Sequence, residues 1–176
     1  MTARLLKRKL SLMKRLILIR HAKSSQEDSS LSDRARPLNA RGVADAPRMG
    51  IALSEFRPLP EAIFTSVAVR AETTARLIAE KLGFDMEAIV AQESLYTFDD
   101  RELLSAIRAF PDQDTCVALV GHNPACHSLF EQLLGQRLDK YVTCGSAIID
   151  FDATSWRQIV ARSGTLVQFL SPKQLS

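Results

Sequence analysis

Two of the three histidines in this chain lie where an apolar run stops abruptly. The first run, residues 16–19, ends at Arg20 and His21, and Lys23 and Ser24 follow in the next stretch. A short apolar run with polar boundaries predicts a buried strand of an α/β sheet, and ligands of such sheets bind at the carboxyl ends of the strands. We therefore expect these four side chains to lie at a binding site.

The second histidine follows the same pattern about a hundred residues later. The apolar run at residues 117–120 ends in Gly121, His122, Asn123 and Pro124. Asn123 is a favoured N-cap residue and Pro124 a favoured first helical residue, so His122 is predicted between a strand end and a helix N-terminus. A helix N-terminus favours an anion, and the two histidines together point to phosphate chemistry.

Four segments, in order along the chain, resemble the motifs of the histidine phosphatase (phosphoglycerate mutase-like) superfamily. Residues 20–22 (Arg-His-Ala) resemble the arginine–histidine–glycine signature, and residues 36–42 resemble the segment that opens the first helix. Residues 66–75 resemble the segment that supplies a second phosphate-binding arginine, and residues 121–124 resemble the second histidine motif. The resemblance runs from about Met13 to the end, and it is greatest to the small bacterial phosphohistidine phosphatases.

This resemblance implies a role for each motif residue. His21 would be the nucleophile, because a neutral imidazole that attacks phosphorus divides one displacement into two. Arg20 and Arg70 would hold the phosphoryl oxygens, and His122 would donate a hydrogen bond to the transferring group. Further phosphate contacts are expected from Lys23, Ser24 and Asn123. Ala22 replaces the glycine of the signature and narrows the backbone's approach to a ligand only slightly. Because arginines stand in for a cation in this family, the resemblance implies no metal site and no other cofactor.

No clear general acid is visible in the sequence. Related phosphomonoesterases protonate an alkoxide leaving group with a carboxylic acid, whereas the phosphohistidine branch lacks or displaces it because imidazole departs readily. The carboxylates of the expected stretch, residues 93–101, are Glu93, Asp99 and Asp100, and Asp99 already fits a helix N-cap. We therefore predict a metal-independent phosphatase that forms a phosphohistidine enzyme intermediate and dephosphorylates phosphohistidine in a protein partner. A small-molecule phosphomonoesterase acting on a phosphate ester and a non-catalytic phosphate-binding module are the alternatives.

Length and charge bound the remaining possibilities. A chain of 176 residues with 46% hydrophobic residues fits one domain with a full core. Six of the 23 basic residues fall in residues 1–15, which hold no acidic residue, so the net charge of +3 comes from the N-terminus. The mildly acidic remainder argues against nucleic-acid binding. We expect residues 1–12 to be a disordered extension or the product of an upstream start, and residues 13–176 to be one histidine phosphatase domain.

The cysteines and the hydropathy indicate a cellular setting. Cys116, Cys126 and Cys144 are odd in number and lack a paired metal spacing, which predicts reduced thiols in a cytoplasmic protein. No apolar run approaches transmembrane length, so no membrane association is expected. We expect a monomer.

Strand and helix signals alternate along the chain. They predict a three-layer α/β/α sandwich with a mostly parallel mixed sheet and one antiparallel edge, as in phosphoglycerate mutase-like proteins. Asn39 is expected to cap a helix that runs to about Glu55 with Pro47 inside it, and Ser66 is expected to cap a helix that ends at Gly83. The further expected strands cover residues 62–65, 85–91, 147–151, 157–161 and 166–170, and further helices start at Asp99 and Pro124.

Overall fold

A computed structural model describes residues 13–175 of the chain. The expectation for residues 1–12 lies outside the described residues. The strands are β1 (Met13–Arg20), β2 (Ala62–Ser66), β3 (Val90–Gln92), β4 (Cys116–Gly121), β5 (Ser146–Asp152) and β6 (Gly164–Leu170). The α-helices are α2 (Ala40–Leu53), α3 (Val69–Leu82), α4 (Asp100–Arg108) and α5 (Ala125–Leu134). Short 3-10 helices are η1 (Asp33–Ala35), η2 (Met86–Ala88), η3 (Glu93–Leu95), η4 (Trp156–Gln158) and η5 (Pro172–Gln174).

The strands form one mixed sheet in the order β3-β2-β4-β1-β5-β6. Neighbours from β3 to β1 are parallel, while β5 is antiparallel to both β1 and β6. The reversed strand therefore lies inside the sheet, and the edge strand β6 again runs in the direction of β1. The two antiparallel pairings lie together at one edge of the sheet, which confirms the predicted mostly parallel mixed sheet with one antiparallel edge.

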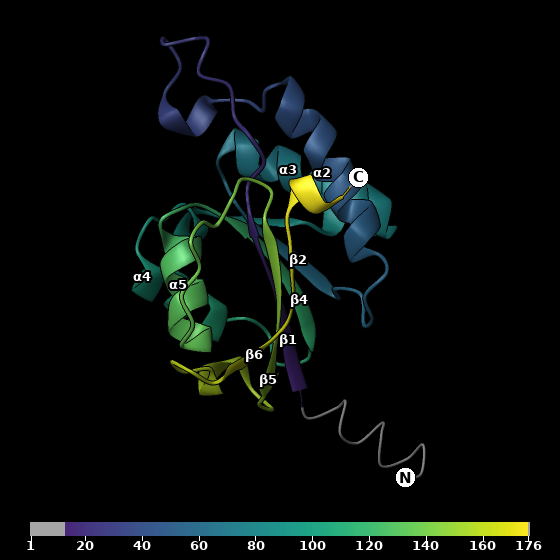
Figure 1. Ribbon diagram of the computed structural model, residues 1–176, viewed down its shortest axis with the longest axis vertical. Coiled ribbons are helices and arrows are strands. Elements are labelled where there is room, and N and C mark those ends of the chain that lie inside the picture. The colour runs from purple at the N-terminus through teal and green to yellow at the C-terminus, as the bar shows by residue number, and fades with distance from the viewer. Residues whose placement is uncertain (1–12, 176) are drawn as a thin grey trace.

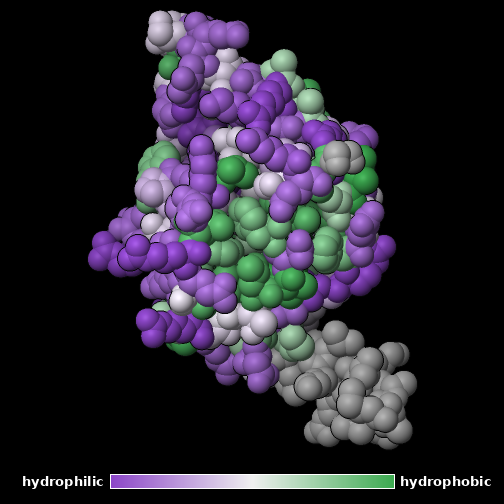
Figure 2. Space-filling model, in the orientation of Figure 1, coloured by the Kyte–Doolittle hydropathy of each residue, from purple (hydrophilic) through white to green (hydrophobic). Residues whose placement is uncertain are grey.

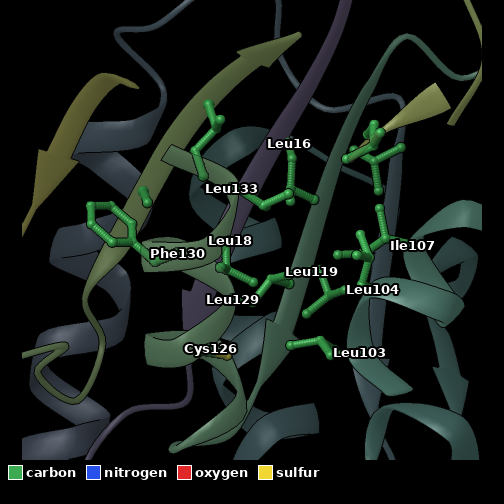
Figure 3. Close-up of a cluster of buried hydrophobic side chains, with 14 of the residues drawn as sticks. Leu16, Leu18, Leu103, Leu104, Ile107, Leu119, Cys126, Leu129, Phe130 and Leu133 are labelled. Atoms are coloured by element: carbon green, nitrogen blue, oxygen red, sulfur yellow. The ribbon is translucent and has the colours of Figure 1, made fainter. Parts of the chain in front are cut away.

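Helices cover both faces of the sheet, which confirms the three-layer sandwich. Figure 1 shows α4 and α5 on one side and α2 and α3 on the other. Alternate residues of β1 enter opposite cores, because successive side chains of a strand point to opposite faces. Leu16 and Leu18 pack with α4 and α5, as Figure 3 shows, whereas Ile17 and Ile19 pack with α2 and α3.

Two helix starts follow the sequence prediction. The Asn39 side chain accepts a hydrogen bond from the Gly42 backbone N–H at the start of α2, and Pro47 lies inside that helix. The Asp99 side chain accepts from the Arg101 backbone N–H at the start of α4. In both cases a short polar side chain satisfies an amide that the first helical turn leaves free.

Two other predicted caps are wrong. Ala68 is the N-cap of α3, so Ser66 ends β2 instead and its hydroxyl is available to a neighbouring strand end. Pro124 is the N-cap of α5, and no side chain caps this helix. The Asn123 amide instead donates a hydrogen bond across to the Tyr141 carbonyl at 3.0 Å.

Two predicted strands are also wrong in whole or in part. Residues 157–161 do not form a strand, because Ser155 and Gln158 make a capping box that winds η4. The fully buried Trp156 anchors this turn, and its indole N–H donates to the Asp114 carbonyl at 2.9 Å. Residues 85–91 form η2 followed by the start of β3, because the Asp85 side chain caps a turn at its own end.

The long loop after β1 extends past the end of the sheet (Figure 1), and the surface there is mostly hydrophilic (Figure 2). Gly42 holds the base of this loop close to α2. A Cβ at this position would lie 2.2 Å from the Lys23 carbonyl oxygen, far inside van der Waals contact. In residues 13–175, no helix is both long enough and apolar enough to span a bilayer.

Candidate functional site

The carboxyl ends of three adjacent parallel strands bring the predicted residues together. The sheet places β1 beside β4 and β4 beside β2, and the His21 backbone N–H donates to the Gly121 carbonyl at 3.0 Å. A cavity of about 210 Å³ opens at this edge. It is lined by Arg20, His21, Lys23, Ser24, Gln26, Asp33, Arg36, Arg70, Phe98, His122, Asn123 and Thr143. All seven residues predicted from the sequence are in this set.

A larger hollow of about 430 Å³ lies beside α4. Its lining consists of Ser94, Glu102, Ser105, Ala106 and Ala109. It offers no arginine, lysine or histidine to an anion, so it is a poor candidate for phosphate chemistry.

The environment of His21 fixes which ring nitrogen is free. Its Nδ1 lies 2.7 Å from the Ala22 carbonyl oxygen, which can only accept, so Nδ1 carries the proton. Its Nε2 then holds a lone pair and lies 3.2 Å from Arg70 Nε. Burial, together with the charges of Arg70, Arg20 and Arg36, lowers the pKa of His21 to about 4. The imidazole is therefore neutral near pH 7, and its Nε2 is able to act as a nucleophile.

Arg70 reaches the centre of the site from the first turn of α3. It is 2% exposed, and its Nη2 lies 3.3 Å from His122 Nδ1 as well as 2.8 Å from a carboxylate oxygen of Asp33. A buried guanidinium that contacts both histidines has a charged fork beside the Nε2 of His21. Such a fork matches the oxygens of a phosphoryl group.

Asp33, which the sequence reasoning missed, is the acidic member of the cavity. Besides Arg70, its side chain accepts hydrogen bonds from the Tyr96 hydroxyl at 2.8 Å and from Arg36 Nη2 at 2.5 Å. Partial burial raises the pKa of this carboxyl, but the hydrogen bonds from Arg70 and Tyr96 outweigh that effect and lower it to about 2. Asp33 is therefore an ionised acceptor. The sequence offers one signal for this: residues 24–37 are polar and rich in serine and aspartate, which is typical of a loop.

His122 has a partner on each ring nitrogen. Its Nε2 lies 2.8 Å from Ser66 Oγ, and its ring centroid is 5.0 Å from that of His21. Burial first, then the neighbouring His21 and Arg70, lowers the pKa of His122 to about 3. A hydroxyl both donates and accepts, so Ser66 is compatible with either tautomer of a neutral imidazole. Arg70 Nη2 can only donate, so in this structure His122 Nδ1 accepts, and Nε2 carries the proton and donates to Ser66 Oγ. The donor role expected for His122 requires the other tautomer, with a proton on Nδ1 in place of the contact with Arg70.

A backbone carbonyl holds Arg20 and Asn123 at the opposite wall of the cavity. Arg20 Nη1 donates to the Tyr141 carbonyl at 2.8 Å, and the Asn123 amide donates to the same oxygen. Arg20 Nε and Asn123 Oδ1 are both buried without a hydrogen-bond partner among the described residues. An unpaired buried donor is unfavourable, so Arg20 Nε is available to an oxyanion.

The three carboxylates considered as general acids are not part of this cavity. Glu93 is exposed and pairs with Arg34 at 2.7 Å. Hydrogen bonds from Arg101 lower the pKa of Asp99 to about 2, so it is a cap and an anion. Asp100 begins α4.

The third histidine, His127, also lies outside the cavity, with its Nε2 2.7 Å from the Leu138 carbonyl. Within residues 13–175, no group of three or more metal-ligating side chains is placed to hold a metal ion.

Comparison with known proteins agrees with this geometry. The profile of the histidine phosphatase superfamily (branch 1) matches residues 16–95. An uncharacterized chloroplastic protein of Arabidopsis thaliana is 33% identical over 162 residues, covering 88% of this chain and 74% of the relative. An uncharacterized protein of Mycobacterium tuberculosis is 29% identical over 165 residues, covering 88% of this chain and 100% of the relative.

Two solved structures show the same fold. The crystal structure of SixA from Agrobacterium tumefaciens has 28% identity and a TM-score of 0.76, covering 90% of this chain and 98% of the other. The protein histidine phosphatase SixA in complex with tungstate has 21% identity and a TM-score of 0.77, covering 92% and 99%. The ordered motifs, the cavity that their residues line and these likenesses lead to one conclusion: this chain belongs to the SixA-like branch of the histidine phosphatase superfamily.

Proposed function

We propose that this phosphatase removes the phosphoryl group from phosphohistidine in a protein partner, through a phosphohistidine formed on His21 and without a metal ion. The observation that carries the proposal is the neutral His21 ring, whose Nε2 faces the buried Arg70 while its Nδ1 proton is held by the Ala22 carbonyl. A nucleophile in this state needs no base to activate it.

The proposed reaction has two displacements. His21 Nε2 forms a bond to phosphorus as the phosphorus–nitrogen bond of the substrate breaks, and the substrate imidazole leaves with its electron pair. An imidazole that carries a proton on its other nitrogen departs as a neutral molecule. Water then attacks the phosphohistidine at His21, and the products are phosphate and the free enzyme. Arg20 and Arg70 neutralise the charge on the phosphoryl oxygens in both steps, which is the task of a cation in metal-dependent phosphatases.

The charge state of the cavity favours an imidazole leaving group over an alkoxide. An alkoxide needs a proton from a general acid with a pKa near the working pH. Asp33 is the carboxylate of the cavity, and its pKa of about 2 keeps it ionised. Glu93, Asp99 and Asp100 do not line the cavity.

The size of the cavity supports a protein substrate. Its volume of about 210 Å³ is below the range of about 300–1,000 Å³ in which drug-sized ligands are usually enclosed. It suits a phosphoryl group, with the rest of the substrate lying outside. The related SixA structure holds tungstate, a tetrahedral oxyanion of similar shape.

The test is a turnover panel at one pH, with a phosphohistidine protein, phosphoramidate and an alkyl phosphate as substrates. The proposal expects the phosphorus–nitrogen substrates to react far faster, with unchanged rates in EDTA. It also expects acid-labile, alkali-stable phosphate to be trapped on the wild-type chain and not on His21→Ala. Faster turnover of the alkyl phosphate would favour a small-molecule phosphomonoesterase, and binding of phosphate without any turnover would favour a non-catalytic module.

A further inference from the structure

A second cavity of about 370 Å³ adjoins the cavity around His21, which we call the phosphate cavity. It is lined by Arg20, Lys23, Arg41, Lys140, Val142, Thr143 and Lys173. Arg20, Lys23 and Thr143 line both cavities, so the two spaces share a wall. A substrate with its phosphoryl group at His21 therefore has this second space directly beside it.

The charge of the second cavity differs from that of the rest of the protein. Five of its lining residues are basic and none is acidic. From residue 16 to the end, the chain as a whole carries 17 basic and 20 acidic residues. Five cations in one hollow are therefore not explained by average composition. Like charges this close repel one another, and a bound anion would relieve the repulsion.

Intramolecular partners do not account for these cations. Among residues 13–175, the side chains of Lys23, Lys140 and Lys173 form no ion pair or hydrogen bond with another residue, and all three are exposed. Arg41 has a partner, Asp45 on the next turn of α2, at 3.3 Å. Three unpaired ammonium groups thus face the same space.

Four separate parts of the chain bring these charges together. Lys23 follows β1, Arg41 lies in the first turn of α2, and Lys140 lies in the loop before β5. Because β6 runs in the direction of β1, its carboxyl end reaches the same edge of the sheet and carries Lys173 in η5. Figure 1 shows this C-terminal turn beside α2, with which it is in contact.

We propose that the second cavity binds acidic side chains of the protein that carries the phosphohistidine, and so selects partners with carboxylates beside the phosphorylated residue. The proposal rests on the proposed function. Carboxylates fit better than a second phosphoryl group, because the cavity presents separate, exposed lysine ammonium groups. The phosphate cavity next to it instead uses the buried fork of Arg70.

The test compares two phosphohistidine peptides that are identical except at the flanking positions, which are Asp and Glu in one and Asn and Gln in the other. The variant is the double substitution Lys140→Glu/Lys173→Glu, which leaves Arg20 and Lys23 in place. The matched control is Arg76→Glu/Arg157→Glu, which makes the same change in net charge at two exposed arginines that line neither cavity. Thermal unfolding checks that each variant is folded.

For wild type, kcat/KM should be about tenfold higher for the acidic peptide at low salt, and the difference should shrink as salt screens the charges. Lys140→Glu/Lys173→Glu should abolish or reverse this preference and change kcat/KM for the neutral peptide by less than about twofold. The control variant should keep the preference. An equal rate for both peptides with wild type, or the same loss in the control, overturns the second cavity as a carboxylate site while the proposed function stands.

Two further arms separate the remaining outcomes. If wild type hydrolyses neither phosphohistidine peptide but hydrolyses alkyl phosphates, the proposed function fails and this inference fails with it. If the double variant loses turnover only of a small substrate with a second phosphate group, such as a bisphosphate, the cavity takes a phosphoryl group and the assignment to protein carboxylates is overturned.

Discussion

Asp33 Oδ2 lies 2.8 Å from Arg70 Nη2, so a carboxylate of the loop after β1 is paired with the arginine that we expect to bind phosphate. The pairing is asymmetric: Arg70 is 2% exposed, whereas the Asp33 side chain is 47% exposed. Arg70 also contacts both histidines, whereas Asp33 begins η1 in the segment between β1 and α2. The Asp33 backbone carbonyl accepts a further hydrogen bond from Arg70 Nη1. An incoming phosphoryl group therefore competes with Asp33 for one guanidinium.

This competition leads to a prediction for Asp33→Asn. Removing the negative charge while keeping the shape should strengthen binding of tungstate or vanadate by about threefold, the scale of one partly exposed ion pair. Competitive inhibition of turnover measures this directly. The paired control is Asp28→Asn, an exposed aspartate on the same loop that does not line the cavity. Weaker oxyanion binding by Asp33→Asn would mean that the carboxylate orients Arg70 and does not compete for it.

The Asp33 contact also shows where sequence reasoning stops. The site residues at the ends of β1 and β4 could be predicted, because a short apolar run that stops at polar residues is a local signal. The entry of Asp33 into the site depends on how the loop at residues 24–37 folds back over the strand ends, and no local pattern encodes that path. Ser66 illustrates the same limit. A serine at this position in the sequence suits a helix N-cap, but because β2 packs beside β4 its hydroxyl forms a hydrogen bond with His122 instead.

The antiparallel edge of the sheet could be predicted, but its order of strands could not. Alternation of apolar residues identified the strands that became β5 and β6, but strand order and direction depend on contacts far apart in the sequence. The 3-10 helix η4 stands where a strand was predicted: the Ser155–Gln158 capping box winds the turn, and Trp156 within it is fully buried in the core.

Both histidines should make the protein less stable in mild acid. The pKa of His21 is about 4 and that of His122 about 3 in the folded protein, against 6.5 for an ordinary histidine. The unfolded chain therefore binds protons that the folded chain does not. Stability from the two groups is complete above pH 6.5 and is lost as the pH falls toward 4, at about 1–2 kcal/mol for each histidine by pH 5.

Urea unfolding at pH 7 and pH 5 measures this loss. The double variant His21→Asn/His122→Asn should show a flatter dependence of the unfolding free energy on pH across this range. Equal slopes in wild type and the double variant would show that the imidazoles are not held neutral by burial.

Ser66 should matter to catalysis through His122. Replacement by alanine removes the hydroxyl that lies 2.8 Å from His122 Nε2 and leaves a buried ring nitrogen without its partner. We expect Ser66→Ala to lower kcat by about 5- to 150-fold, the range that corresponds to a loss of roughly 1–3 kcal/mol for one buried hydrogen bond. Ser66→Thr keeps the hydroxyl and should recover part of the rate. Thr65→Ser, a neighbouring buried change on β2, serves as the control for packing.

Gly42→Ala should destabilise the fold, although alanine is the better helix former. The helix propensity of alanine favours the variant by about 1 kcal/mol. The added methyl would, however, lie 2.2 Å from the Lys23 carbonyl, which belongs to backbone and cannot move away cheaply. We expect a net loss of about 1–3 kcal/mol in urea unfolding, the usual scale of overpacking, together with a weaker phosphate site because Lys23 is displaced. Gly83→Ala tests the opposite situation, because nothing lies within 4 Å of a Cβ there and only its positive φ is strained.

The dependence of the rate on the pKa of the leaving group shows whether any carboxylate acts as a general acid. With Asp33 ionised and Glu93, Asp99 and Asp100 outside the cavity, the rate should fall steeply as the leaving group becomes more basic. Alanine at each of the latter three positions should leave phosphohistidine hydrolysis nearly unchanged. Asp99→Ala should cost about 1 kcal/mol of stability, because its side chain caps α4.

A series of phosphate esters with graded leaving-group pKa, measured with wild type and each variant, gives the slope of rate against leaving-group pKa. A shallow slope in wild type that becomes steep in one variant, with a loss of ~10²-fold or more for alkyl esters, would identify that residue as the acid and replace the phosphohistidine substrate with an ester.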